Sequence, residues 1–307
     1  MTAPRRAGRQ QRDNTVLRLT ALTAVLLGLV LIALRFLPGA PLSANPGGGA
    51  WEVAGGSGES TGQATPTPTP APSLPPLPVS AKEVDVDLDG WYSWALMDTR
   101  TGEISGSDNR DETSTTASLI KAWIAADYLR RTTEQGKQPS DTRLAQVRVM
   151  IRDSDNAAAE TLYTVNGRTA SIRRLIEICG LTDSSPASNG GWSRTQLSAQ
   201  DTVRMGACIA DGRAAGPEWT DWLLDEMRAV RGVGDFGIRK AFPAEERRQI
   251  AIKNGWVDRV AEQEYHVNCL AIGDGWTMAV MVRYAINRGY LPGAKVCQQV
   301  AEQLRTE

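Results

Sequence analysis

Residues 38–82 constrain the fold most, because their composition does not suit a packed core. The segment contains Asn45-Pro-Gly-Gly-Gly-Ala50 and then Thr65-Pro-Thr-Pro-Thr-Pro-Ala-Pro72. Glycines make a backbone flexible, whereas closely spaced prolines hold it extended. We therefore expect residues 38–82 to be a linker, and we expect one folded domain over residues 83–307.

A basic segment and an apolar segment precede the linker. Residues 1–18 carry five arginines and one aspartate, and Leu19–Leu34 contains no charged residue. This order is typical of a signal peptide or a signal anchor, and the positive-inside rule places the arginines in the cytoplasm. We predict that residues 1–37 are a cytoplasmic tail and a single membrane span, with residues 19–37 in the cytoplasmic membrane and the later domain extracytoplasmic. Secretion after cleavage near Leu42-Ser43-Ala44 is the alternative.

The charge balance and the single histidine narrow the chemistry. The chain has 34 Lys+Arg against 35 Asp+Glu, so nothing in its charge favours nucleic acid as a partner. One histidine, His266, excludes zinc sites built on several histidines, and the four cysteines lack C-x-x-C spacing. We therefore expect no metal and no cofactor. A lone histidine in a predicted strand is more often structural than catalytic, although one facing the site would modulate Lys253.

The predicted elements run in the order hairpin, helical block, three strands and closing helix. The hairpin is expected over residues 91–97 and 103–107. Helices are expected over residues 119–129, 139–151, 157–163, 171–179, 198–208 and 219–230, with a polar loop over residues 182–196. Strands are expected over residues 249–257, 265–272 and 276–282, and a last helix over residues 293–304. Both ends of the domain supply strands, so we predict an α/β (α+β) sandwich: an antiparallel sheet with an inserted helical subdomain.

A run of hydroxyl residues, Thr113–Ser118, comes directly before the apolar segment 119–129. The hydroxyls are candidate helix caps, and an all-round apolar helix is expected to be buried. Ser118 then lies in the first turn, with Lys121 on the same face. Burial favours a neutral amine, which can take the proton of a serine and make it a nucleophile. The structural alternative is a capped core helix whose lysine extends to the surface.

Two further motifs have a structural and a functional interpretation. Ser154-Asp155-Asn156 lies between two helical segments, where it is either a helix cap or a hydroxyl and an amide that face Ser118. Lys253-Asn254-Gly255-Trp256 ends an apolar strand. It is either a strand end with a turn glycine, or a lysine that supplies positive potential beside a glycine that lets a substrate approach the backbone.

Ser-x-x-Lys, Ser-Asp-Asn and Lys-x-Gly occur in that order, and together they resemble the motifs of serine β-lactamases and penicillin-binding proteins, most of all the class A type. The resemblance covers about residues 85–307 and implies the β-lactamase/transpeptidase-like fold. It implies that Ser118 is the acylated nucleophile, that Lys121 is its base, and that Ser154 relays the proton to the leaving nitrogen. β-Lactams or D-alanyl peptides of peptidoglycan are the substrates implied.

The same resemblance implies a set of substrate contacts. Asn156 would hold the amide of the substrate, and Lys253 and Asn254 would meet its carboxylate. The N–H groups of the nucleophilic serine and of Trp256 would form the oxyanion hole. Gly255 lies between these residues and leaves room for the substrate.

Two departures from the family pattern affect the expected activity. Asn254 stands where the family has threonine, although asparagine still donates to a carboxylate. The glutamate that activates the deacylating water in class A enzymes should fall between Gly180 and Ser198, but this stretch contains Asp183 and no glutamate. Asp183 lies too near the preceding helix to take that role. We therefore expect an acyl-enzyme that forms and then persists.

An extracytoplasmic domain permits disulfides, and four cysteines allow three pairings. Cys179 and Cys208 lie in the helical block, whereas Cys269 lies on a strand that the closing helix, with Cys297, should cover. We therefore predict the pairs Cys179–Cys208 and Cys269–Cys297. No cysteine follows the N-terminal apolar run closely, so we expect no lipoprotein anchor.

Two functions fit these patterns. The first is a membrane-anchored, extracytoplasmic serine hydrolase, acylated at Ser118, with slow peptidase or esterase chemistry. The second is a non-catalytic module of the same fold that binds peptidoglycan peptides or a protein. The two lysines and the Ser-Asp-Asn motif favour the enzyme, whereas Asn254, the bulky Trp256 and the missing glutamate favour the binding module. Chance occurrence of the three motifs is the remaining alternative.

Overall fold

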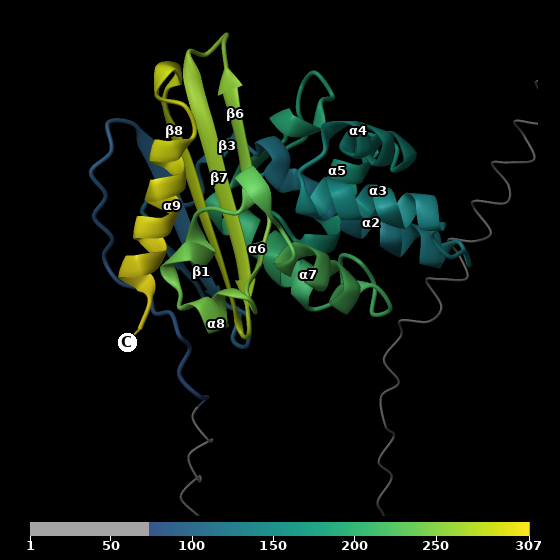
Figure 1. Ribbon diagram of the computed structural model, residues 1–307, viewed down its shortest axis with the longest axis horizontal. Coiled ribbons are helices and arrows are strands. Elements are labelled where there is room, and N and C mark those ends of the chain that lie inside the picture. Colours follow the sequence, from purple (N-terminus) through teal and green to yellow (C-terminus); the bar gives the residue numbers. More distant parts are fainter. Residues whose placement is uncertain (1–73, 307) are drawn as a thin grey trace, which may run out of the picture. The chain divides into compact units, whose positions relative to one another are not determined.

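The computed structural model describes residues 74–306 (Figure 1). The predicted cytoplasmic tail, the predicted membrane span and most of the predicted linker lie outside these residues. Within the described range, no helix combines the length and the apolar character that crossing a bilayer requires. Val79 is buried and forms an isolated bridge with Arg305, and the Ser80 N–H donates to the carbonyl of Leu304 at 2.8 Å. Contacts with the end of the chain thus begin before residue 83.

The centre of the domain is an antiparallel sheet formed by both ends of the described chain. Its strands are β1 (Trp91–Asp98), β2 (Ile104–Gly106), β5 (Ala251–Ile252), β6 (Gly255–Arg259), β7 (Glu264–Gly273) and β8 (Trp276–Ala285). They lie in the order β2-β1-β8-β7-β5, and β6 also pairs with β7. The first and last parts of the domain meet where β1 pairs with β8, with Trp91 opposite Arg283. The predicted α/β sandwich with a sheet from both chain ends is confirmed.

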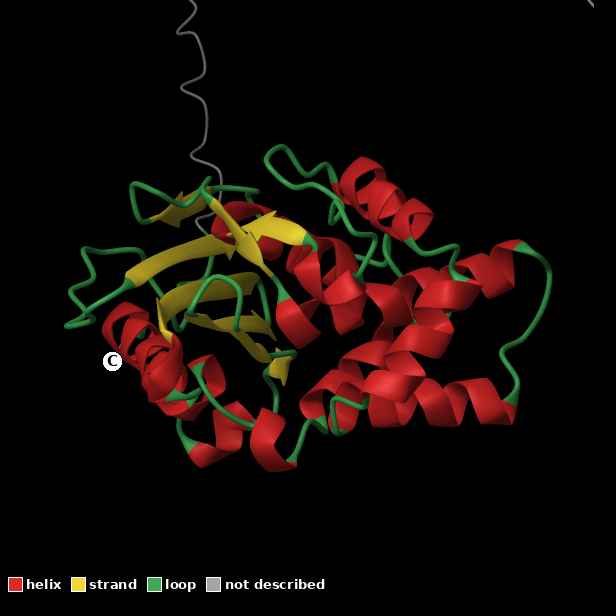
Figure 2. Ribbon diagram, turned by 90° about the horizontal axis from the view of Figure 1, so that it is seen from above, coloured by secondary structure: helices red, strands yellow, loops and turns green. Residues whose placement is uncertain are grey.

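Helices cover both faces of this sheet (Figure 1). Helix α9 (Leu291–Leu304) packs against β7 and β8, and α6 (Ala199–Ala210) packs against β1, β7 and β8 on the other face. Figure 2 shows the remaining long helices gathered on the α6 side as a separate block. They are α2 (Lys121–Glu134), α3 (Asp141–Arg152), α4 (Asn156–Val165), α5 (Thr169–Cys179) and α7 (Thr220–Arg228), while α8 (Ala244–Arg247) is one short turn.

The hydroxyl run before α2 forms a strand instead of helix caps. Strand β3 (Thr113–Thr115) pairs with β4 (Gln196–Ser198), so the predicted polar loop over 182–196 also ends in a strand. Thr116 precedes the 3-10 turn η1 (Ala117–Ile120) and makes no side-chain cap. The cap prediction is wrong because a tertiary strand pairing holds the backbone here. The predicted burial of α2 is confirmed, since its first nine residues are all buried.

The single strand predicted over 249–257 is interrupted at Lys253 and Asn254. Both pieces pair with β7 in the same register, with Ile252 opposite Ala271 and Gly255 opposite Asn268. The interruption therefore leaves one continuous line of chain at the edge of the sheet. The two residues between the pieces belong to the third predicted motif, and the Lys253 N–H still donates to the carbonyl of Leu270 at 3.2 Å.

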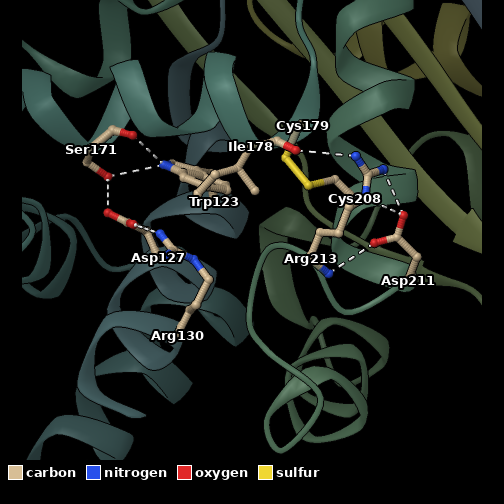
Figure 3. The surroundings of a disulfide bond; sticks show 9 residues. All are labelled: Trp123, Asp127, Arg130, Ser171, Ile178, Cys179, Cys208, Asp211 and Arg213. Atoms are coloured by element: carbon tan, nitrogen blue, oxygen red, sulfur yellow. Dashed lines mark hydrogen bonds and ion pairs between the residues drawn. A yellow bond between two sulfur atoms is a disulfide. The ribbon is translucent and has the colours of Figure 1, made fainter. Parts of the chain in front are cut away.

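Both predicted disulfides are confirmed. Cys179–Cys208 joins the end of α5 to α6, with Cα atoms 5.4 Å apart (Figure 3). Cys269–Cys297 joins β7 to α9, with Cα atoms 6.3 Å apart. The first bond ties the helical block to α6, and the second fixes the covering helix α9 to the sheet. Each links two layers that the fold must keep in place.

A buried polar network fixes α2 against α5 (Figure 3). Trp123 donates its indole N–H to the carbonyl of Ser171 at 3.0 Å, and the Ser171 hydroxyl donates to Asp127 at 2.6 Å. Asp127 is fully buried and pairs with Arg130 at 2.7 Å and Arg174 at 2.6 Å. The network holds the helix that begins at Lys121 in one position.

Candidate active site

Ser118 lies in the turn η1, where the helical block meets the sheet. It is half-buried, whereas its neighbours Leu119 and Ile120 are fully buried. Ala117 directly before it has φ +49°, in the left-handed region that residues with a Cβ rarely adopt. Such backbone strain persists only where the surrounding structure enforces it, and it gathers at functional sites. The fold therefore presents Ser118 on a constrained, partly accessible turn.

Lys121 begins α2 and is fully buried. Its Nζ donates to the carbonyl of Ser154 at 2.6 Å, to the Ser154 hydroxyl at 3.3 Å and to Asn156 Oδ1 at 2.7 Å. Burial lowers the pKa of Lys121 from 10.5 to about 7, against the opposing charge of Asp155. An amine with this pKa holds and releases a proton near neutral pH. None of its hydrogen bonds within residues 74–306 goes to Ser118.

Ser154 lies between two buried amines. Its Oγ is 3.3 Å from Lys121 Nζ and 3.2 Å from Lys253 Nζ, and its φ of +59° is a second strained angle in the site. Lys253 is fully buried and also donates to the carbonyl of Asn254 at 2.9 Å. Burial lowers the pKa of Lys253 well below its ordinary value, and the charge of Lys121 lowers it further. The Ser154 hydroxyl thus lies between the amines of Lys121 and Lys253. A positive charge on one amine disfavours a positive charge on the other.

Gly255 allows β6 to approach the Ser118 turn at backbone distance. A Cβ at this position would lie 2.7 Å from the Ser118 nitrogen and 2.5 Å from the Leu119 nitrogen. Any side chain would therefore push the strand and the turn apart. The backbones of β6 and of the Ser118 turn therefore lie in direct contact at Gly255.

Asn254 does not face this site. It is buried, and its amide donates to the carbonyl of Gly234 at 3.0 Å and to that of Phe236 at 2.8 Å. Trp256 lies on the same side of the strand and packs edge-on against Phe236, with ring centroids 5.6 Å apart. This orientation does not support the predicted contact between Asn254 and a substrate carboxylate, because the amide holds the segment 234–236.

Trp192 is a site residue that the sequence analysis did not identify. It begins the 3-10 turn η2 (Trp192–Arg194), which packs against η1. Its ring centroid lies 4.9 Å from Lys121 Nζ, and its indole N–H donates to Glu160 at 3.1 Å. The signal in the sequence was one large aromatic residue in an otherwise polar loop. No feature of the neighbouring sequence indicated that Trp192 would contact Lys121.

Asp183 and His266 both have structural partners. Asp183 accepts hydrogen bonds from Ser198 at 2.8 Å and from Gln200 at 2.7 Å. Burial raises the pKa of Asp183, but these bonds outweigh it and lower the pKa overall. His266 lies 2.8 Å from the Thr115 hydroxyl and 2.9 Å from Glu264, so it links β7 to β3. Among residues 74–306, no group of three or more His, Cys, Asp or Glu side chains is arranged to bind a metal.

A family model described as the β-lactamase enzyme family matches residues 137–306, more than half of the chain. The chain belongs to this family. The matched range contains Ser154 and Lys253 and begins after Ser118 and Lys121. Curated relatives named "Putative lipoprotein LppW", from Mycobacterium tuberculosis and Mycobacterium bovis, are 28% identical over 188 residues. The alignment covers 59% of this chain and 59% of each relative, so the chain spans less than two thirds of their length.

Solved structures of class A β-lactamases have the same fold. The complex of L2 with relebactam aligns with a TM-score of 0.57 at 19% identity, covering 69% of this chain and 89% of that chain. An ancestral class A β-lactamase aligns with a TM-score of 0.55 at 18% identity, covering 69% and 92%. A β-lactamase from Chitinophaga pinensis aligns with a TM-score of 0.54 at 18% identity, covering 69% and 91%. The fold implied by the three motifs is therefore confirmed.

Proposed function

We propose that this domain is an active-site serine hydrolase that is acylated at Ser118 by β-lactams or by D-alanyl peptides of peptidoglycan. One observation carries the proposal: a fully buried lysine with a pKa of about 7 lies one turn after the serine. A buried amine without a carboxylate partner reduces stability, and a purely structural helix has no use for it. A chain that uses arginine for most of its cations keeps lysine here, where a neutral amine has a chemical role.

The proposed reaction uses Lys121 as the base and Ser154 as the proton relay. The neutral amine of Lys121 takes the Ser118 hydroxyl proton while Oγ attacks the carbonyl carbon of the substrate. The C–Oγ bond forms first and gives a tetrahedral oxyanion. The C–N bond breaks when this intermediate collapses, and the Ser154 hydroxyl passes the proton from Lys121 to the leaving nitrogen. The N–H groups of Ser118 and Trp256 stabilise the oxyanion. The close approach of strand and turn at Gly255 supports this last role.

Two residues are proposed to position the substrate. Asn156 accepts a hydrogen bond from Lys121 through Oδ1 at 2.7 Å, which leaves its amide NH₂ to donate to a substrate carbonyl. Lys253 would meet the substrate carboxylate, because its amine lies 3.2 Å from the Ser154 hydroxyl at the same site. A substrate carboxylate that approached this amine would raise its pKa and favour the charged form.

We also propose an extracytoplasmic, membrane-associated location. Two disulfides within residues 74–306 suit an oxidising compartment, and the curated relatives carry the name of a lipoprotein. The first cysteine of this sequence is Cys179, which pairs with Cys208 inside the domain. We therefore assign the anchor to the apolar residues 19–37. Deletion of residues 19–37 should move the protein from the membrane fraction to the soluble fraction, and retention in the membrane would contradict this assignment.

A non-catalytic binding module is the second candidate. The buried orientation of Asn254 favours it, because the side chain in the third motif is turned away from any ligand at Ser118. A binding module would hold cell-wall peptides without forming a bond to the serine.

Labelling with a fluorescent penicillin separates the two candidates. The full chain in detergent is incubated with the reagent, denatured and examined on a gel beside the variant Ser118→Ala. The hydrolase proposal expects a covalent band in the wild type and none in the variant. Reversible binding without a covalent band in either protein would support the binding module instead.

A further inference from the structure

The segment 190–195, which carries Trp192, is fixed at one end to the helical block. The Tyr163 hydroxyl of α4 donates to the carbonyl of Gly190 at 3.3 Å. The Trp192 indole N–H donates to Glu160, also on α4, at 3.1 Å. Both contacts fix the ring where it lies over the amine of Lys121.

The other end of this segment is fixed to the β6–β7 hairpin. Arg194 pairs with Glu262 at 2.6 Å, and the buried Arg259 donates to the carbonyl of Ser193 at 2.5 Å. The segment 190–195 thus bridges the helical block and the sheet, and its turn η2 packs on the turn that carries Ser118. Anchors on both sides hold it as a fixed cover.

The surroundings of Lys121 Nζ offer no base for a water molecule. Its contacts are oxygen atoms of Ser154 and Asn156 and the face of Trp192, and the side chain is fully buried. Glu160 is the acid that contacts the Trp192 side chain, and both of its oxygens are engaged. One accepts from Trp192, and the other accepts from Arg168 at 2.5 Å.

We propose that Trp192 is a positioning residue that keeps water away from the acyl group on Ser118 and so makes the acyl-enzyme long-lived. In deacylation, a water oxygen must attack the acyl carbonyl carbon. The C–Oγ bond then breaks, one proton returns to Ser118 Oγ, and the free acid leaves. The indole fills the space beside the Lys121 amine from which such a water would come, and it offers no hydrogen-bond acceptor.

This inference rests on the proposed acylation of Ser118, and a pulse-chase experiment distinguishes the two. The full chain in detergent is acylated with a fluorescent penicillin and freed of excess reagent, and loss of the adduct is followed by intact mass. We expect Trp192→Ala to lose the adduct about tenfold faster than the wild type, less than the 10²–10⁴ of a positioned general base. Trp192→Phe keeps an apolar ring but loses the bond to Glu160, so its rate should lie between those of the wild type and Trp192→Ala.

A pH profile of deacylation separates water exclusion from a merely structural effect. In Trp192→Ala, water reaches Lys121, so the rate should rise as the amine becomes neutral, while the wild type stays slow at each pH. Glu160→Ala and Glu160→Gln form a matched pair that changes the partner of the indole N–H and leaves the indole ring in place. The alanine variant frees the indole N–H and should shorten the lifetime, whereas glutamine still accepts that bond and should not.

The outcomes are separable. An adduct whose lifetime is the same in the wild type, Trp192→Ala and Glu160→Ala overturns the role of Trp192 and leaves the acylation proposal standing. No adduct in the wild type overturns acylation and the role of Trp192 together. A Trp192→Ala chain that fails to fold, seen as loss of the cooperative thermal transition, leaves the Glu160 pair to decide.

Discussion

The helix α2 carries two buried charged residues whose surroundings are opposite. Asp127 is fully buried, and its carboxylate lies 2.7 Å from the guanidinium of Arg130 and 2.6 Å from that of Arg174. Lys121, two turns earlier, is as fully buried, yet its partners within residues 74–306 are neutral oxygens and an aromatic ring. The negative charge of Asp127 is therefore compensated, whereas the amine of Lys121 can lose its proton and become neutral.

This difference separates a structural site from a reactive one. A buried carboxylate paired on both oxygens stabilises one arrangement of helices, because no other position satisfies it. A buried amine with no acid in direct contact is held near its point of titration by desolvation, against the charge of Asp155. The same helix is thus fixed at Asp127 and reactive at Lys121. Lys253 repeats the second pattern, since it is also fully buried and has no salt bridge among the described residues.

Replacing the reactive amine should produce the largest effect. We expect Lys121→Met to slow acylation by about 10³-fold, within the range of a positioned general base. The free energy of unfolding should stay equal or rise, because methionine fills the space without an unpaired polar group. Acylation is measured with a fluorescent penicillin, and stability by urea denaturation. A variant that acylates normally would show that Lys121 is not the base.

Replacing the paired carboxylate of Asp127 should have the opposite effect: stability falls and the acylation rate changes little. Asp127→Ala leaves Arg174 without its acid, leaves Arg130 with Glu134 alone, and removes the acceptor for Ser171. We expect a loss of about 3 kcal/mol in the free energy of unfolding, as for broken buried ion pairs. The acylation rate of the folded fraction should change less than about threefold, because no reacting group is touched. A large loss of acylation in fully folded protein would contradict the division into two sites.

The dependence of stability on pH should be a smaller effect and should come from the amines. The folded-state pKa of Lys121 is about 7, below its ordinary 10.5, so the unfolded state binds the proton first as pH falls. The contribution of Lys121 to stability is therefore most favourable above pH 10.5 and declines towards pH 7. Between pH 9 and pH 7 we expect a loss of about 2 kcal/mol, at most 1.4 kcal/mol for each pH unit. Urea denaturation measures it, and Lys121→Met should flatten the slope; an equal slope in that variant would assign it to other groups.

The sequence was sufficient for the features that depend on local pattern. The all-round apolar segment after Ser118 predicts the buried helix α2, and it is buried in the structure. Apolar segments bounded by turn residues predict most strands. The structure shows that both ends of the domain form one sheet. The disulfides follow once each cysteine is placed on an element, because Cys269 and Cys297 lie on layers that must pack.

The features that the sequence did not predict depend on contacts between distant segments. Asn254 turns to the carbonyls of Gly234 and Phe236, and no property of the strand itself reveals that segment. The hydroxyl run before α2 becomes a strand because it pairs with residues 196–198. Trp192 reaches Lys121 only because the β3–β4 pairing brings η2 onto η1. Side-chain direction at the site is thus a tertiary property.

The pH dependence of acylation tests the central claim most directly. The rate constant for labelling of the full chain by a fluorescent penicillin is measured from pH 5 to pH 10, with Ser118→Ala as the control. A base that acts in its neutral form, with a pKa of about 7, predicts a rate that rises with pH to half its maximum near pH 7. A flat profile, a midpoint near the ordinary lysine value, or labelling that survives in Ser118→Ala would contradict the account.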